Sequence, residues 1–226
     1  MLYFIITLVL FLINKGHIMF IDFALSNNVL KFGEFTLKSG RTSPYFFNAG
    51  LFNTGKQLAI LADYYAKLIV DSKVEFDVLF GPAYKGIPLV AAISIILATK
   101  YNIDTPFAFD RKEKKDHGEG GIFVGADMQN KKVILVDDVM TAGTAFFESY
   151  DKLKTINAEI VGVALSIDRQ EVAKDSDLSA TQRISSQFNI PVLAITNFSE
   201  IYKYAKSNLD NITITKFEEY RNKYGA

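Results

Sequence analysis

The sequence contains no cysteine and no tryptophan, and neither sign of charge is in excess. Without cysteine the chain has no disulfide framework, no thiolate metal site and no thiol nucleophile, which suits a cytoplasmic protein. Its 25 basic residues balance its 25 acidic residues, so no overall field attracts nucleic acid or anionic lipid. Any binding of anions must therefore be local.

Internal repeats, low-complexity linkers and a second domain are also missing, and 226 residues suit one α/β domain. Residues 1–13 are almost wholly apolar, with Thr7 the only polar residue. This run falls short of the roughly 20 residues that span a membrane, and it lacks the basic start and cleavage site of a secretory signal. We expect residues 1–18 to be a non-functional extension from an upstream start codon, with a short membrane anchor as the alternative. Residues 19–226 are expected to form the single domain.

The stretch 133–145 organises the rest of the chain. Its first four residues are apolar and rich in β-branched side chains, which predicts a buried strand. Asp137 and Asp138 follow at once, and the small, hydroxylated residues 141–144 lead into a helix expected from about Ala145. A helix amino terminus after a tight turn presents free N–H groups and the positive end of its dipole. The stretch therefore predicts a phosphate site.

The two carboxylates set this loop apart from the glycine-rich loops of nucleotide-binding proteins. Carboxylates beside a phosphate repel it unless they face something else, and neighbouring sugar hydroxyls can donate hydrogen bonds to them. A ribose 5-phosphate fits, with its phosphate in the threonine loop and its diol on Asp137 and Asp138. The alternative is an acidic strand end that holds magnesium, as in receiver domains, which leaves residues 141–144 unexplained.

A second unit of the same kind precedes this one. Residues 76–80 predict a strand, residues 81–86 a glycine-bracketed loop, and residues 87–100 a helix with Pro88 in its first turn. This loop carries a cation, Lys85, in place of carboxylates. Two phosphate-binding loops at one sheet edge suit a ligand with phosphates at both ends.

The amino-terminal region predicts a helix over residues 22–31 and then extended segments, broken at residues 39–40 and 43–44. Lys38 lies beside the first break, where an ammonium can reach a phosphate, although an exposed lysine is usually only solvated. Phe46 and Phe47 are consecutive, and neighbouring strand residues face opposite ways. Both rings cannot join one core face, so one can be offered to a planar base.

Residues 110–121 contain four basic residues, four acids and three glycines, and no apolar residue. For an arbitrary charged run, a solvated loop is the ordinary interpretation. The glycines also allow a lid that closes over a polyphosphate and neutralises it with Arg111, Lys112, Lys115 and His117.

The remaining segments alternate. Thr54 is expected to cap a helix over residues 55–71; helices are expected at 146–157, 179–188 and from 198, and strands at 106–109, 159–167 and 192–196. Arg169 stands at the carboxyl end of the strand 159–167, where a guanidinium can fork onto carboxylate or carbonyl oxygens. An ordinary surface ion pair is the alternative. The alternation predicts an α/β fold with a mainly parallel sheet flanked by helices.

These motifs resemble a known family. The stretch 133–145 is similar to the phosphoribosyl-pyrophosphate (PRPP) binding motif of type I phosphoribosyltransferases. The order Arg-Lys-Glu-Lys-Lys-Asp-His-Gly-Glu-Gly-Gly at residues 111–121 is similar to the catalytic loop of orotate phosphoribosyltransferases. The resemblance to that family extends from about Phe20 to the carboxyl terminus. It implies the type I phosphoribosyltransferase fold with a small amino-terminal α+β hood, and transfer of ribosyl 5-phosphate from PRPP to orotate.

The resemblance also implies roles for individual residues. Catalysis is expected to involve Lys38, Lys115, His117 and Asp138, and orotate to be bound by Phe46, Phe47, Thr141 and Arg169. PRPP is expected to be bound by Lys38, Tyr84, Lys85, Arg111, Lys112, Lys115, His117, Asp137, Asp138, Val139, Met140, Thr141, Ala142, Gly143, Thr144 and Ala145. Mg²⁺ is expected as the cofactor, held mainly through PRPP, with no protein ligand assigned. A homodimer is expected in which the loop 111–121 is shared between subunits, with Lys112 reaching across; neither nucleic acid nor a membrane is expected as a partner.

Two alternatives remain. A regulator that senses PRPP without turnover could lose the lid residues, whereas this chain keeps them. A phosphoribosyltransferase for another base is disfavoured by Phe46, Phe47 and Arg169, since those positions are expected to contact the base rather than PRPP.

Overall fold

The computed structural model describes residues 19–37, 39–115, 121–141, 143–173 and 176–226. Within these ranges no helix combines the length and the apolar character needed to cross a bilayer. The predictions for residues 1–18, and those for Lys38, His117 and Ala142, fall outside the described residues. The side chain of Lys115 is also not described.

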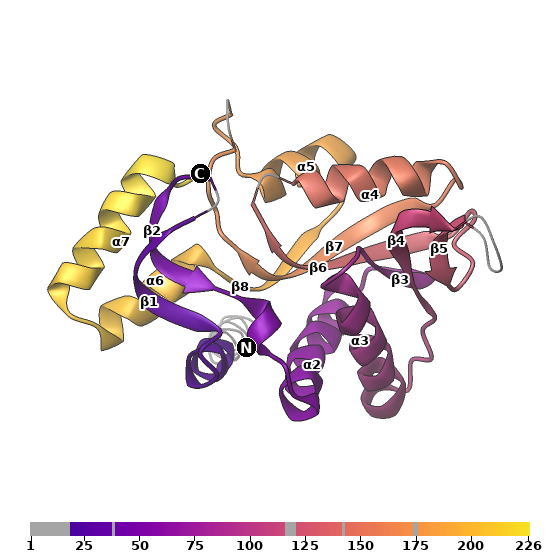
Figure 1. Ribbon diagram of the computed structural model, residues 1–226, viewed down its shortest axis with the longest axis horizontal. Helices are drawn as coiled ribbons and strands as arrows, with labels where there is room; N and C mark the ends of the chain where they lie inside the picture. The colour runs from indigo at the N-terminus through magenta and orange to yellow at the C-terminus, as the bar shows by residue number, and fades with distance from the viewer. Residues whose placement is uncertain (1–18, 38, 116–120, 142, 174–175) are drawn as a thin grey trace, which may run out of the picture.

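A six-stranded sheet forms the centre of the protein (Figure 1). The strand order is β5 (Gly121–Gly125), β4 (Phe107–Lys115), β3 (Val78–Gly81), β6 (Lys132–Met140), β7 (Glu159–Asp168) and β8 (Val192–Asn197). Only β5 runs antiparallel to its neighbour among these strands. The expected mainly parallel sheet is confirmed.

Helices cover both faces of this sheet, which explains why its strands read as continuous apolar runs. In β6, Val133 and Leu135 face a core shared with α4 (Thr144–Lys154) and α5 (Ala180–Phe188). The alternate residues Ile134 and Val136 face the other core, with α2 (Gly55–Ser72) and α3 (Gly86–Tyr101). Figure 1 shows α4 and α5 above the sheet and α2 and α3 below it.

The connections leaving β3 and β6 diverge. From β3 the chain passes through α3 to β4, whereas from β6 it passes through α4 on the opposite face to β7. Because β3 and β6 are neighbours, the strand order reverses between them. In open α/β sheets such a point leaves a crevice at the carboxyl ends of the strands, where ligands bind. Both predicted phosphate loops lie there.

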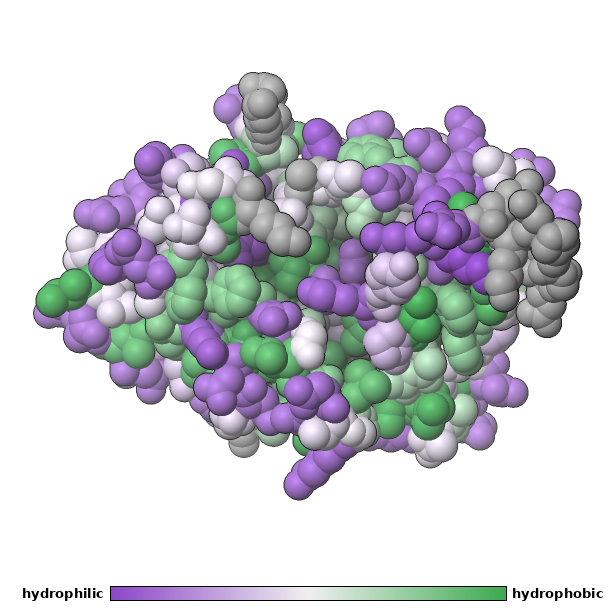
Figure 2. All heavy atoms as spheres, in the orientation of Figure 1, coloured by the Kyte–Doolittle hydropathy of each residue, from purple (hydrophilic) through white to green (hydrophobic). Residues whose placement is uncertain are grey.

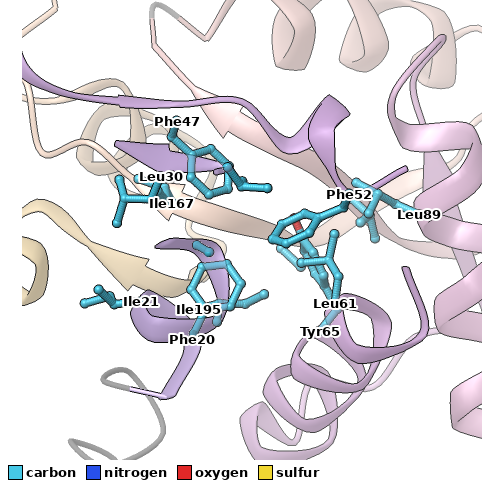
Figure 3. Packing of buried hydrophobic residues seen from close by; sticks show 14 of the residues in the cluster. Phe20, Ile21, Leu30, Phe47, Phe52, Leu61, Tyr65, Leu89, Ile167 and Ile195 are labelled. Atoms are coloured by element: carbon cyan, nitrogen blue, oxygen red, sulfur yellow. The ribbon is translucent and has the colours of Figure 1, made fainter. Parts of the chain in front are cut away.

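A smaller hood lies beside the sheet (Figure 1). It contains a helix at residues 19–26, the antiparallel pair β1 (Leu30–Thr36) and β2 (Thr42–Phe47), a short 3₁₀ helix (Ala49–Leu51), α6 (Phe198–Asn208) and α7 (Asn211–Tyr224). Figure 3 shows Leu30 and Phe47 of the hood close to Ile167 of β7. The predicted amino-terminal α+β unit is therefore present.

The expected helix over residues 22–31 is wrong in its second half. The helix ends at residue 26, and Asn28 adopts a left-handed conformation with φ +58°, which asparagine tolerates better than most residues. This turns the chain so that Val29 and Leu30 are buried as the start of β1.

The helix cap at Thr54 is confirmed. The Thr54 side chain accepts a hydrogen bond from the Gln57 backbone N–H, and the Gln57 side chain accepts one from the Thr54 N–H. Such a reciprocal box satisfies two of the orphan donors at a helix start. On α2, Leu61, Tyr65 and Ile69 form an apolar stripe that packs into the core.

The predicted charged loop at residues 110–121 is partly a strand. β4 continues to Lys115 and pairs with β5, from Ala108 opposite Gly125 to Lys115 opposite Gly121, with a register shift in between. Strand pairing satisfies the backbone hydrogen bonds without any apolar face, so polar composition alone does not exclude a ribbon. On the face shown in Figure 2, hydrophilic residues gather over β4, β5 and the adjoining part of α4.

Candidate active site

The first phosphate loop, residues 82–85, links β3 to α3 and is closed by two glycines. A Cβ added to Gly81 would lie 2.3 Å from the Gly86 carbonyl oxygen, and one added to Gly86 would lie 2.6 Å from the Gly81 carbonyl carbon. Only glycines allow this close approach. The Ala83–Tyr84 peptide bond is cis, and the Tyr84 side chain is 69% exposed. The closed loop holds Lys85 at the start of α3.

Asp110 supports this loop from β4, and sequence analysis did not single it out. Its side chain is only 4% exposed. Its Oδ1 accepts a hydrogen bond from the Ala83 N–H at 2.7 Å, and its Oδ2 accepts one from Lys152 Nζ of α4 at 2.5 Å. One buried carboxylate thus connects the first loop, the base of the β4–β5 ribbon and α4.

The acidic pair lies within β6, which is longer than predicted and runs on to Met140. Asp138 Oδ2 accepts a hydrogen bond from Lys85 Nζ at 2.5 Å, so the two phosphate-loop units are joined by an ion pair. Asp137 Oδ1 accepts a hydrogen bond from the Asp138 N–H, and the Asp137 carbonyl accepts one from the buried Tyr65 hydroxyl. Burial and repulsion from Asp138 raise the pKa of Asp137 to about 7.

The second phosphate loop follows β6. Gly143 adopts φ +79° and precedes α4, whose first residues Thr144 and Ala145 are exposed. The first N–H groups of a helix have no partner within it, so this end is available to an anion. The Met140 side chain is buried in the core, so the predicted contact of this residue with PRPP could be made only by its backbone.

A cleft of about 680 Å³ brings the predicted residues of different segments together. It lies between the hood and the carboxyl ends of the strands, and its volume is typical of sites for small molecules. The predicted residues that line it are Phe46, Phe47, Lys85, Asp138, Val139, Thr141 and Arg169. Phe46 is 38% exposed and Phe47 is 8% exposed, as their opposite orientations on β2 predict.

Arg169 is buried, so the alternative of a surface ion pair is wrong. Its side chain is 5% exposed, and its Nε donates to Glu171 Oε1 at 2.6 Å. Its Nη2 donates to Ser43 Oγ at 3.2 Å and to the Tyr220 hydroxyl at 3.3 Å, and its guanidinium lies over the Tyr45 ring. Burial opposes the charged form, but Tyr45, Glu171 and Tyr220 outweigh it and raise the pKa of Arg169.

The described lid residue Lys112 faces its own chain. Its Nζ lies 5.1 Å from the centroid of the Tyr84 ring in the first phosphate loop. Such a distance is typical of a cation–π contact. In the single chain Lys112 thus lies against its own first phosphate loop, and the expectation that it reaches the partner subunit stays a prediction. The neighbouring lid residue Arg111 donates a hydrogen bond from Nη1 to the Gly121 carbonyl of β5 at 3.5 Å.

A metal site made by the protein alone is not found in the described part of the chain: there, His, Asp and Glu side chains form no group of three or more that could hold an ion. Two adjacent carboxylates beside a phosphate loop nevertheless fit Mg²⁺, which is usually bound through one or two carboxylates together with substrate phosphates.

Comparison with known proteins first identifies the class of protein. Residues 50–194 match the phosphoribosyl transferase domain family. A crystal structure of orotate phosphoribosyltransferase from Francisella tularensis is 73% identical, with a TM-score of 0.86, over 92% of this chain and all of that one. The orotate phosphoribosyltransferases of Haemophilus ducreyi and Kluyveromyces lactis are 52% and 50% identical over 92% of this chain, and over 97% and 94% of their own lengths.

The chain therefore belongs to the orotate phosphoribosyltransferase family. More distant members share the fold: a Mycobacterium tuberculosis orotate phosphoribosyltransferase in complex with PRPP is 16% identical, with a TM-score of 0.60. The expected type I phosphoribosyltransferase fold is confirmed.

Proposed function

We propose that this protein transfers the ribosyl 5-phosphate group of PRPP to orotate, giving orotidine 5′-monophosphate and pyrophosphate. The observation that carries the proposal is the single cleft in which Lys85 of the first loop, Asp138 of the acidic pair and Phe46, Phe47 and Arg169 meet. Relatives named for this activity match nearly the whole chain.

In the reaction a bond forms between orotate N1 and the ribose C1′ as the bond from C1′ to the pyrophosphate oxygen breaks. The bonding electrons leave with pyrophosphate, and orotate N1 is itself the nucleophile, so no enzyme nucleophile is required. Lys85 and the lid cations Arg111, Lys112, Lys115 and His117 stabilise the charge that grows on the leaving pyrophosphate.

On the other side of C1′, the acidic pair orients the ribose. Asp138 is neutralised by Lys85 in the structure described here. Pyrophosphate competes with Asp138 for the Lys85 ammonium, which releases the carboxylate to accept hydrogen bonds from the ribose diol. The 5-phosphate then lies at the start of α4, on the N–H groups and hydroxyls of the second loop.

Mg²⁺ fits the same arrangement, and when bound it supplies positive charge to the departing pyrophosphate. Asp137 and Asp138 are the residues placed to assist in holding it, together with the oxygens of PRPP.

The test of the proposed function is a spectrophotometric assay of orotate consumption with PRPP and Mg²⁺. The wild-type protein is expected to consume orotate, and Arg169→Ala to lose most of this activity. Consumption of a purine base, with orotate left intact, contradicts the proposal.

We also propose a homodimer in which the lid completes the partner's site. The contact of Lys112 with Tyr84 favours a lid in which Lys112 acts in its own subunit and Lys115 in the partner, whereas the family resemblance favours Lys112 reaching across; mixing inactive variants decides between these arrangements. Lys115→Ala mixed with Asp138→Asn is expected to recover up to about a quarter of wild-type activity, since random pairing leaves half of the dimers mixed, each with one intact site.

Lys112→Ala mixed with Asp138→Asn is the matched control and is expected to stay inactive, because both lesions then affect the site of their own subunit. With subunit exchange confirmed by differently tagged chains, absence of recovery in the first mixture excludes sharing by Lys115. Recovery in the second mixture reverses the assignment of Lys112.

We propose that the protein is cytoplasmic. Its substrates are soluble, and a chain without cysteine suits that compartment. Fractionation of cells that express the full chain tests this, and recovery of the protein with the membranes contradicts it.

A further inference from the structure

Two arginines converge on one buried carboxylate at the edge of the cleft. Glu171 is 8% exposed, and its Oε1 accepts hydrogen bonds from Arg169 Nε at 2.6 Å and from the Tyr220 hydroxyl at 2.7 Å. Its Oε2 accepts a hydrogen bond from Arg41 Nη1 at 3.1 Å. Arg41, Arg169 and Glu171 all line the cleft.

The hydrogen bonds fix the Arg169 guanidinium on two sides. Nε is held by Glu171, Nη2 by Ser43 and Tyr220, and the face of the group by the Tyr45 ring. Among the described residues, none accepts a hydrogen bond from Nη1. The planar fork therefore has the two N–H donors of Nη1 left over for a ligand, at a fixed angle.

We propose that Glu171 is a positioning residue for the orotate site: it orients Arg169 so that the remaining donor meets the oxygens of orotate, and Tyr220 of α7 completes this support. The proposal rests on the proposed function. It assigns a role to the carboxyl-terminal helix, since Tyr220 lies 49 residues beyond Glu171 and touches both members of the pair.

An alternative role for Glu171 is purely electrostatic, and it predicts the opposite result. Arg41 and Arg169 together carry two positive charges against one carboxylate. If only charge mattered, removing the carboxylate would increase the positive potential and tighten the binding of anionic orotate. If orientation matters, the same change loosens Arg169 and weakens binding.

The experiment compares Glu171→Gln and Tyr220→Phe with the wild-type protein, measuring kcat and the KM values for orotate and PRPP. We expect Glu171→Gln to raise the KM for orotate roughly tenfold, since hydrogen bonds to charged groups are the strong ones. Tyr220→Phe leaves the charge unchanged and is expected to raise the KM for orotate about three-fold. The KM for PRPP is expected to change less than twofold in both.

Tyr202→Phe is the matched control, because Tyr202 also donates to a glutamate of α7, Glu218, but not to one that holds Arg169. It is expected to leave the KM for orotate unchanged. An equal rise in this control would assign the effect to loosened carboxyl-terminal helices and overturn the proposal.

An unchanged or lower KM for orotate in Glu171→Gln also overturns the proposal. If Glu171→Gln does not fold, because the buried Arg169 and the half-buried Arg41 lose their counter-charge, Tyr220→Phe decides the question alone. Failure of the proposed function is distinguishable, since then the wild-type protein itself does not consume orotate.

Discussion

The units built on β3 and β6 use the same backbone arrangement with opposite charge. Each passes from a buried parallel strand through a short loop into a helix, and the two strands are neighbours, so both loops meet at one edge. The first loop presents Lys85 and the second follows Asp137 and Asp138. A single crevice can therefore bind two phosphate groups and the polar sugar between them.

The two units differ in how their loops are closed. At the first, Gly81 and Gly86 are in backbone contact, whereas a Cβ added to Gly143 of the second would meet side chains at an ordinary 3.4 Å. The first loop depends on the close approach of the Gly81 and Gly86 backbones, and the second depends on the positive φ of Gly143. The units should therefore respond differently to substitution.

The largest expected effect separates the lid from the second phosphate loop. Lys115→Ala and His117→Ala should lower kcat roughly 10²–10³-fold with little change in the KM for PRPP, since the lid acts on charge that grows in the transition state. Thr141→Ala in the second loop should instead raise the KM for PRPP. Steady-state kinetics measure both; a raised KM with intact kcat in the lid variants would make the lid only a binding clamp.

A smaller effect is expected from backbone closure. Gly86→Ala should lower kcat/KM for PRPP about 10²-fold, because opening the first loop displaces Lys85 by an appreciable fraction of an ångström. Gly143→Ala should cost about 5- to 30-fold, since the strain of a left-handed residue is about 1–2 kcal/mol. Equal losses in the two variants would show that the loops are closed by the same means.

The acidic pair should also make the stability of the protein depend on pH. The pKa of Asp137 is about 7 in the folded protein and 3.8 in the unfolded chain, so the folded state holds this proton more tightly. The free energy of unfolding should therefore fall as the pH rises from about 4 to about 7 and then level off.

This fall in the free energy of unfolding should amount to about 1–3 kcal/mol between pH 5 and pH 8 in the wild-type protein, as measured by urea unfolding. Asp137→Asn should abolish it. Asp104→Asn, at an exposed position, is the control and should keep the wild-type slope. An unchanged slope in Asp137→Asn would place the titration elsewhere.

The smallest effect is expected from removing the amino-terminal extension. A chain that starts at Met19 should keep its activity and its melting temperature within a degree or so, since residues 1–18 are predicted to be without function. Loss of activity, or membrane association of the full chain alone, contradicts that prediction.

Local patterns predicted much of this protein. The two strand–loop–helix units, the cap at Thr54 and the opposite exposure of Phe46 and Phe47 all follow from residues close in sequence. The extension of β4 was missed, because its charged residues have no apolar alternation. Asp110 and Tyr220 were missed because their partners are distant in sequence, and only the topology brings them together.

The Asp110–Lys152 pair has a consequence for how the sequence can change over time. Replacing Lys152 alone leaves a carboxylate that is 4% exposed without its cation, and replacing Asp110 alone removes the partner of both Lys152 and the Ala83 N–H. Losing one member of such a pair costs more than exchanging both for neutral residues. The two positions are therefore epistatic, and the substitution tolerated at one depends on the residue already present at the other.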